Sequence, residues 1–190
     1  MKFLMSLSAI LMSVSVMAAE IDTNASTFKW TGTKVTGKHF GTLPVKSASV
    51  KTDKKGNITG GEFVLDITKM TTEDLTGEWK EKFLKHMKSE DFFHVAKWPT
   101  AKLTIDKMDG KKAYGTLNIR DKSEKVTIPY TKKGNAYTGT FKFDRTKFGM
   151  IYGSGDFFKN LGDKMIHNEV SLDFNVVVKK EKSKKLAENN

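Results

Sequence analysis

The C-terminal segment Val170-Ser171-Leu172-Asp173-Phe174-Asn175-Val176-Val177-Val178 decides the fold class of this chain. Its apolar residues stand at every second position, and polar residues separate them over most of its length. Successive side chains of a strand point to opposite faces of a sheet, so this period of two predicts a half-buried β-strand. The same alternation recurs upstream in the ranges 28–31, 62–67, 102–106, 116–120, 126–131 and 141–143.

Turn sequences separate these segments. Glycine, asparagine and aspartate, which tolerate unusual backbone angles, occur in the ranges 54–57, 109–111 and 133–135. With one further segment around residues 39–51, the sequence predicts about eight strands, the number at which a closed barrel can hold one small ligand. We therefore expect an all-β fold.

One stretch, from Thr72 to Lys88, breaks the alternation. Apolar residues recur there every four positions, at Leu75, Trp79, Phe83 and Met87. This spacing predicts a single amphipathic helix inserted between strands, with its apolar stripe buried against the barrel. Thr71, followed three residues later by Asp74, is a start signal for such a helix.

The first residues have the layout of a secretory signal. Lys2 precedes an apolar run from Phe3 to Val16, and two alanines follow at positions 18 and 19. The run is shorter than the ~20 residues that a membrane-spanning helix needs. We expect residues 1–18 to be a cleaved signal peptide and the mature protein to be soluble and periplasmic.

Composition limits the organisation and the partners of the chain. Its 190 residues include no cysteine, so no disulfide framework is possible. Without the signal peptide the length suits one domain, over residues 19–178. The formal net charge of +11 lies partly in a basic tail, residues 179–190, which we expect to be disordered. A basic surface favours contact with anionic membranes, and export makes nucleic acid a poor partner.

The strand faces that we assign to the interior carry no Asp, Glu, Lys or His. A catalytic cavity needs acids, bases or a nucleophile, so this interior favours an apolar ligand over a reaction. A solidly filled barrel has the same pattern, and the sequence leaves both open. The expected tunnel lining comprises Phe28, Trp30, Phe63, Leu103, Leu117, Phe141 and Phe143 from strands, with Phe83 and Met87 of the helix closing one end. Gly115 shares a face with Leu117, so Gly115→Leu is expected to narrow the interior.

Aromatic residues gather between the predicted strands. Exposed aromatic loops usually cover or bind something. These residues are Phe92, Phe93, Trp98, Phe148, Tyr152, Phe157 and Phe158.

Arg145 follows the 141–143 segment and is our candidate for holding a polar head group, with His39 or His86 nearby. The planar fork of a guanidinium matches phosphate or carbonyl oxygens. A structural ion pair with Asp91 or Asp144 is an equally good interpretation of Arg145.

Two other classes of function remain open. The first is a lipid-acting enzyme that uses His39, His86 and Asp91, although no nucleophile and base can be assigned from the spacing. The second is a structural or stress-induced barrel without a ligand. The histidines, at positions 39, 86, 94 and 167, do not have a metal-ligand spacing, so we expect no metal site.

Several motifs in order resemble the YceI-like family. The segment Lys85-His86-Met87-Lys88-Ser89-Glu90-Asp91-Phe92-Phe93, followed by Trp98-Pro99-Thr100, is similar to the family signature, and further matches lie at 30–32, 37–41, 60–63, 115–119 and 143–149. Roughly residues 26–178 are covered. Met87 stands in place of a leucine, His94 where an acidic residue is common, and Asp121 in place of a glycine.

The resemblance implies a lipocalin-like antiparallel barrel in the periplasm. Characterised relatives enclose a polyisoprenoid chain, such as an isoprenoid quinone or a polyprenyl phosphate, and no catalytic activity or cofactor comes with the family. Neither the chain length of the lipid nor pairing of the protein as a homodimer follows from the sequence.

Overall fold

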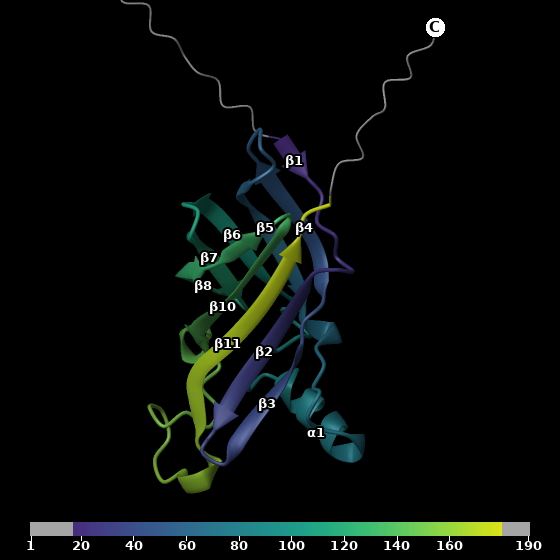
Figure 1. Cartoon of the computed structure of the whole chain (residues 1–190). Coiled ribbons are helices and arrows are strands. Elements are labelled where there is room, and N and C mark those ends of the chain that lie inside the picture. The colour runs from purple at the N-terminus through teal and green to yellow at the C-terminus, as the bar shows by residue number, and fades with distance from the viewer. Residues whose placement is uncertain (1–16, 180–190) are drawn as a thin grey trace, which may run out of the picture.

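The computed structural model describes residues 17–179, and within them it contains eleven strands and one α-helix (Figure 1). Short 3-10 helices cover Ile67–Lys69, Arg145–Phe148 and Gly162–Lys164. The longer elements are β1 (Met17–Ala19), β2 (Thr27–Lys34), β3 (Gly37–Thr42), β4 (Val45–Thr52), β5 (Ile58–Asp66), α1 (Gly77–Met87), β6 (Thr100–Met108), β7 (Lys112–Ile119), β8 (Lys122–Pro129), β9 (Thr131–Lys133), β10 (Ala136–Asp144) and β11 (Ile166–Val177).

The strands form two antiparallel sheets. One has the order β1-β4-β5-β6-β7-β8, and the other has the order β3-β2-β11-β10-β9. The predicted all-β fold with one helix is confirmed. None of the helices in the described residues has the length and apolar character to cross a membrane.

The sequence predicts a closed barrel of eight strands, and the closure is wrong. In the described residues no ladder of hydrogen bonds joins the two sheets. The chain crosses between sheets beside Pro44, from β3 to β4, and beside Pro129, from β8 to β9. Proline has no N–H, so neither Pro44 nor Pro129 can donate a hydrogen bond to a strand of the other sheet at these crossings. At the second crossing a Cβ on Gly139 would lie 2.3 Å from the Pro129 carbonyl oxygen, so only glycine lets β10 approach so closely.

The alternation predicted from the sequence is confirmed on the strands that carry the core. In β7 every second residue from Ala113 to Ile119 is buried, and in β6 the same holds from Ala101 to Ile105. Burial of each large apolar side chain stabilises the fold by about 1.5–3 kcal/mol. These inward faces of both sheets form one continuous core.

The helix begins at Gly77, five residues after the expected start, and ends at Met87. The residues before it bind the free edge of β3: the N–H groups of Thr71 and Glu73 donate to the carbonyl oxygens of Thr42 and Phe40, at 3.0 and 2.9 Å. This pairing covers an edge strand. It also fixes the segment in an extended course, so the helix cannot start there.

The predicted burial of the helical stripe is wrong in part. No residue of α1 is fully buried, and the Trp79 side chain is 73% exposed. Phe83, Leu84 and Met87 are partly buried and pack against the core. Only the C-terminal half of the stripe therefore covers the sheets.

Most of the expected signal peptide and of the tail lies outside the described residues, in 1–16 and 180–190. Met17 and Ala18 belong to β1, which pairs with β4. Lys179, the first residue of the expected tail, donates its backbone N–H to the Glu20 carbonyl oxygen at 2.8 Å.

Candidate functional site

The interior is hollow at one end of the molecule. A cavity of about 380 Å³ lies between the sheets, where the β2–β3 turn, α1 and the segment after β10 come together. In Figure 1 these three segments gather at the end away from β1. A smaller cavity, of about 50 Å³, lies further along the sheets and has only apolar and tyrosine side chains in its wall.

All nine residues expected to line a tunnel border one of these cavities. Phe28, Phe63 and Leu103 border the small cavity, Trp30, Phe83, Met87, Leu117 and Phe143 border the large one, and Phe141 borders both. The structure thus brings together side chains from five strands and the helix. Their contact with a ligand stays a prediction.

Phe83 of α1 is held as a wall of the large cavity by ring contacts on two sides. Its ring is stacked on Trp30, with centroids 6.0 Å apart, and lies 4.6 Å from the His39 ring. The Trp30 indole donates to the Thr71 carbonyl oxygen at 3.1 Å. The segment before the helix therefore positions the indole against which the helix packs.

Arg145 borders the large cavity and is 3% exposed. Its guanidinium donates to three backbone carbonyl oxygens, those of His167 (3.1 Å), Ile166 (3.0 Å) and Met150. Burial lowers the pKa of Arg145, and the Asp144 carboxylate opposes this effect. The alternative interpretation, an ion pair with Asp91 or Asp144, is not formed, because the guanidinium binds the carbonyl oxygens of Met150 and of the first two residues of β11 instead.

His39 stands at the rim of the large cavity and is oriented by a carboxylate. Its Nδ1 lies 2.7 Å from an Asp74 oxygen. Burial favours a raised pKa for Asp74, but hydrogen bonds from Thr72, His39 and the Phe40 N–H outweigh it, and the pKa is lowered. An ionised Asp74 accepts from Nδ1, which leaves Nε2 as the acceptor of the neutral ring. The sequence identified Asp74 only as a helix start signal and missed this role.

His86 also stands at the rim, and its Nε2 lies 3.0 Å from an oxygen of Asp91. The His86 ring meets Phe92 and Tyr152 edge-on, at centroid distances of 5.1 and 4.6 Å. Of the three residues considered for an enzyme, the structure therefore pairs His86 with Asp91, whereas His39 binds Asp74.

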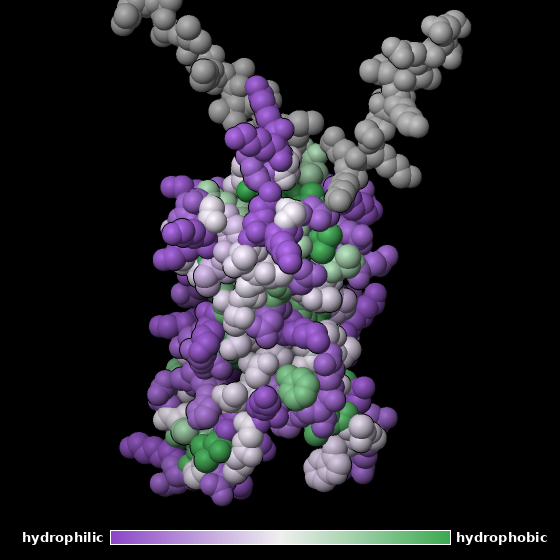
Figure 2. Space-filling view, in the orientation of Figure 1, coloured by the Kyte–Doolittle hydropathy of each residue, from purple (hydrophilic) through white to green (hydrophobic). Residues whose placement is uncertain are grey.

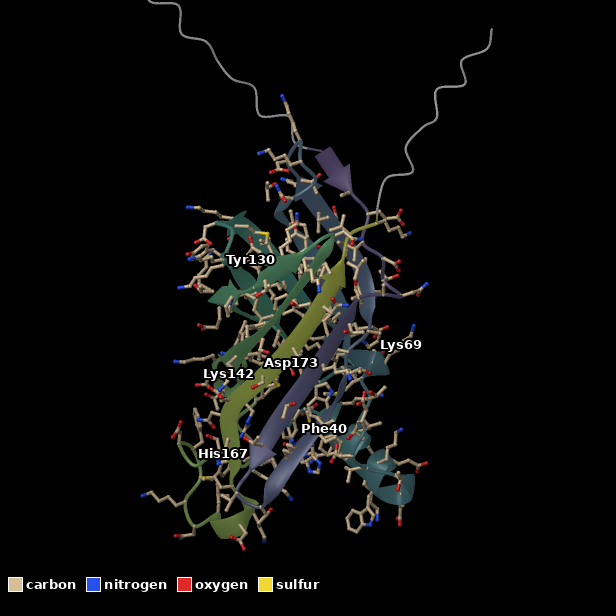
Figure 3. The ribbon with its side chains drawn as sticks, viewed as in Figure 1. Phe40, Lys69, Tyr130, Lys142, His167 and Asp173 are labelled. Atoms are coloured by element: carbon tan, nitrogen blue, oxygen red, sulfur yellow. The ribbon has the colours of Figure 1, made fainter. Side chains whose placement is uncertain are left out.

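Sequence reasoning missed several polar residues of the rim, among them Lys34, Lys164 and His167. His167 Nδ1 lies 2.8 Å from the Thr33 hydroxyl oxygen, and Figure 3 shows His167 near the lower end of β11. The pairing of β11 with β2 shifts register between Ile166 and Val170. Strict alternation cannot anticipate a bulge. In the part of the chain described, no group of three or more potential ligands could hold a metal ion.

A family model, the YceI-like domain, matches residues 20–178. The chain belongs to the YceI-like family. No curated protein matches it. Several solved structures share the YceI-like fold of this chain at low sequence identity, so they are informative about the fold alone.

BcnA of Burkholderia cenocepacia has a TM-score of 0.64 and 20% identity, over 84% of this chain and 100% of BcnA. A polyisoprenoid binding domain from Saccharophagus degradans, described as implicated in plant cell wall breakdown, has a TM-score of 0.59 and 11% identity, over 88% of this chain and 99% of that domain. The Campylobacter jejuni YceI protein has a TM-score of 0.51 and 15% identity, over 95% and 94% of the two chains.

Two departures from the YceI-like pattern have local explanations. Asp121 lies in the two-residue turn between β7 and β8, where Arg120 takes the left-handed backbone conformation (φ 58°), and the pairing of the two strands is uninterrupted. His94 is also left-handed (φ 48°), and its Nε2 lies 3.5 Å from a Glu90 oxygen. A basic side chain at 94 thus neighbours an acidic one.

Proposed function

We propose that this protein is exported to the periplasm and there binds and carries an isoprenoid-type lipid, of the isoprenoid quinone or polyprenyl phosphate class, without catalysing a reaction. The observation that carries the proposal is a cavity of about 380 Å³ whose walls are mostly apolar and whose ionisable residues, apart from the buried Arg145, stand at the rim. This division suits an amphiphile with a long apolar chain and a small polar head.

Packing energetics support an occupant. At about 24 cal/mol per Å³, an empty apolar cavity of this volume would forgo up to roughly 9 kcal/mol of packing free energy. The rim is open to water, so this value is an upper limit. A buried prenyl chain would regain contacts and add ~0.8 kcal/mol per CH₂ removed from water. The two sheets would then enclose the chain in the manner of a lipocalin barrel.

The head group would lie at the rim beside Arg145. Three of the five N–H groups of a guanidinium are used by backbone carbonyls, and the other two are available to phosphate or carbonyl oxygens. Nε2 of His39 is the second polar group there, since Nδ1 binds Asp74. The polyisoprenoid binding domain from Saccharophagus degradans, which shares the fold, also supports this ligand class.

Organic extraction of protein purified from its native periplasm, followed by mass spectrometry, tests the proposal. Wild-type protein should release a prenyl lipid in stoichiometric amount. Gly32→Leu should release much less, because Gly32 borders the large cavity and a Cβ there would meet only Trp30, at 4.0 Å. Thr31→Leu, which adds bulk on the opposite face of β2, is the matched control. Equal lipid in all three proteins, or none in the wild type, would contradict the proposal.

Export is tested on the same material. N-terminal sequencing should begin at Ala19 or Glu20, after removal of the basic and apolar start. Recovery of an intact Met1 chain from the membrane fraction would contradict cleavage.

The pair of His86 and Asp91 at the rim is the observation that favours an enzyme instead. Conversion of the extracted lipid to a product by wild-type protein, abolished in His86→Ala, would replace the carrier with a lipid-acting enzyme. A carrier should return the lipid unchanged in both proteins.

A further inference from the structure

The exposed apolar residues of this protein gather at one end. In the described residues, every large apolar side chain that is exposed belongs to the β2–β3 turn, to α1 or to the loop after β10, and these are Val35, Trp79, Ile151, Tyr152, Phe157 and Phe158. Each of the three segments also contributes to the wall of the large cavity. We call these six residues, with the lysines of the same segments, the mouth surface.

Isolated exposed apolar residues are normal on a soluble protein, but their confinement to one end is not. Trp79 and Phe157 are 73% and 55% exposed, and Figure 2 shows apolar groups among hydrophilic ones at this end. Tyr152 is both exposed and part of the cavity wall. The mouth surface is therefore continuous with the opening of the cavity.

Basic charge is concentrated on the same segments. The 35 residues in the ranges 34–38, 77–88 and 147–164 include nine lysines and four acidic residues. The other 128 described residues include 19 basic and 16 acidic ones. Most of the net positive charge of the described chain thus lies around the exposed aromatic residues.

We propose that the mouth surface docks on the surface of an anionic phospholipid bilayer, with the cavity opening toward the lipid. Tryptophan and tyrosine favour the boundary between headgroups and acyl chains, where their rings are buried and their polar atoms stay wet, and phenylalanine inserts a wholly apolar ring there. Lysines bury their stems and keep their ammonium groups among lipid phosphates. Lys82 places one ammonium group beside the most exposed ring of the mouth surface, since its Nζ lies 5.6 Å from the centre of the Trp79 ring and 2.6 Å from a Glu78 oxygen.

The arrangement fits a bilayer better than a folded partner. The six side chains come from three separate segments around an opening. A fluid bilayer accommodates scattered anchors without shape complementarity. Transfer of a lipid from the bilayer into the cavity rests on the proposed carrier function. Docking itself can be measured without any ligand in the cavity.

Co-sedimentation of the full mature chain with vesicles tests the docking. The protein should bind vesicles that contain phosphatidylglycerol and should not bind vesicles of phosphatidylcholine alone. Replacement of Lys85 and Lys159 by glutamine should weaken binding by roughly 30-fold, from the contribution of about two surface lysines. The matched control replaces Lys54 and Lys55, two exposed lysines near β1, and should weaken it far less.

Two further variants test the apolar part. Phe157→Ser should weaken binding although the net charge is unchanged. Brominated lipids should quench the tryptophan fluorescence of the wild type, and Trp79→Phe should remove most of that quenching. Of the two tryptophans that remain, Trp30 is buried, and Trp98 lies outside the three segments and is partly covered by Lys97 and Arg120.

The docking would be overturned if the protein bound neutral and anionic vesicles equally, or if the two double-lysine variants lost the same amount of binding. Quenching that is undiminished in Trp79→Phe would overturn it too. A homodimer that Phe157→Ser dissociates, without vesicle binding, would assign the surface to a second copy of the chain. Uptake of detergent-dispersed prenyl lipid by the Lys85 and Lys159 variant separates the two proposals, since a carrier that cannot dock should still bind a ligand offered without a bilayer.

Discussion

Phe141 should set the length of the apolar chain that the protein binds. Its side chain lies in β10, is 3% exposed, and borders both the cavity of about 380 Å³ and the smaller one of about 50 Å³. A bound chain that enters from the rim would stop against this ring. Phe141→Ala should join the two cavities and let the chain extend inward.

The substitution should weaken the folded protein without ligand but strengthen the binding of a longer chain. Without ligand, the substitution should lower the free energy of unfolding by ~3–5 kcal/mol, the usual cost of removing a buried phenyl ring. With ligand, one additional isoprene unit in the joined space should contribute roughly 3–4 kcal/mol, at ~0.8 kcal/mol per buried carbon. The variant should therefore bind the longer chain roughly 100- to 700-fold more tightly than the chain one unit shorter.

Isothermal titration calorimetry with prenyl alcohols of increasing length measures this. In the wild type the affinity should stop rising once the chain fills the large cavity, and in Phe141→Ala it should stop at a longer chain. Phe143→Ala is the control, because Phe143 borders only the large cavity. An unchanged limiting length in Phe141→Ala would refute the reasoning, as would a wild-type affinity that rises with length without limit.

Other substitutions test the parts around the cavity. Trp79→Ala should leave the urea midpoint unchanged because the side chain is 73% exposed, whereas Phe83→Ala should lower the free energy of unfolding by up to ~3–5 kcal/mol. Arg145→Met leaves three carbonyl oxygens without their donor, and denaturant unfolding should show a loss of at least ~3 kcal/mol. Backbone N–H groups and the Tyr114 hydroxyl lower the pKa of Asp109 to about 2. Asp109 should therefore stabilise the fold fully above its unfolded pKa of about 3.9, and this stabilisation should be lost as the pH falls toward 2. In Asp109→Asn the urea midpoint should depend less on pH between about 4 and 2 than it does in the wild type.

The period-two pattern predicts which face a side chain occupies but not the distance to its neighbour. Gly115 does lie on the buried face of β7 with Leu117, as the alternation predicts. A Cβ on Gly115 would lie 2.0 Å from the carbonyl oxygen of Thr104 on β6. Gly115→Leu would therefore disrupt the pairing of β6 with β7 instead of narrowing the cavity, and Gly32 is the position where added bulk can enter it.

The helix illustrates a second limit. Its spacing of four correctly predicts a helix and the contact of Phe83 with the interior, because periodicity records which residues share a face. It does not record what lies opposite that face. The sheet reaches Phe83 but not Trp79, and the extended segment at Thr71 is used by the edge of β3. The pattern of alternation likewise does not record which strands pair. Closure of the barrel depends on hydrogen bonds between strands at the crossings beside Pro44 and Pro129, so the sequence could not predict it.

Arg145 connects the cavity to the loop that carries much of the mouth surface. From the sequence it was either a head-group clamp or half of an ion pair, but its strongest contacts are with backbone, which carries no side-chain signal. The three carbonyl oxygens that it binds belong to Met150, Ile166 and His167, the two ends of the 150–167 segment. One buried cation thus closes the base of the loop that bears four of the six exposed apolar residues. The same guanidinium borders the large cavity, so an anion bound in that cavity would contact the side chain that fixes the loop. Head-group binding and the position of the mouth surface would then depend on one residue, Arg145.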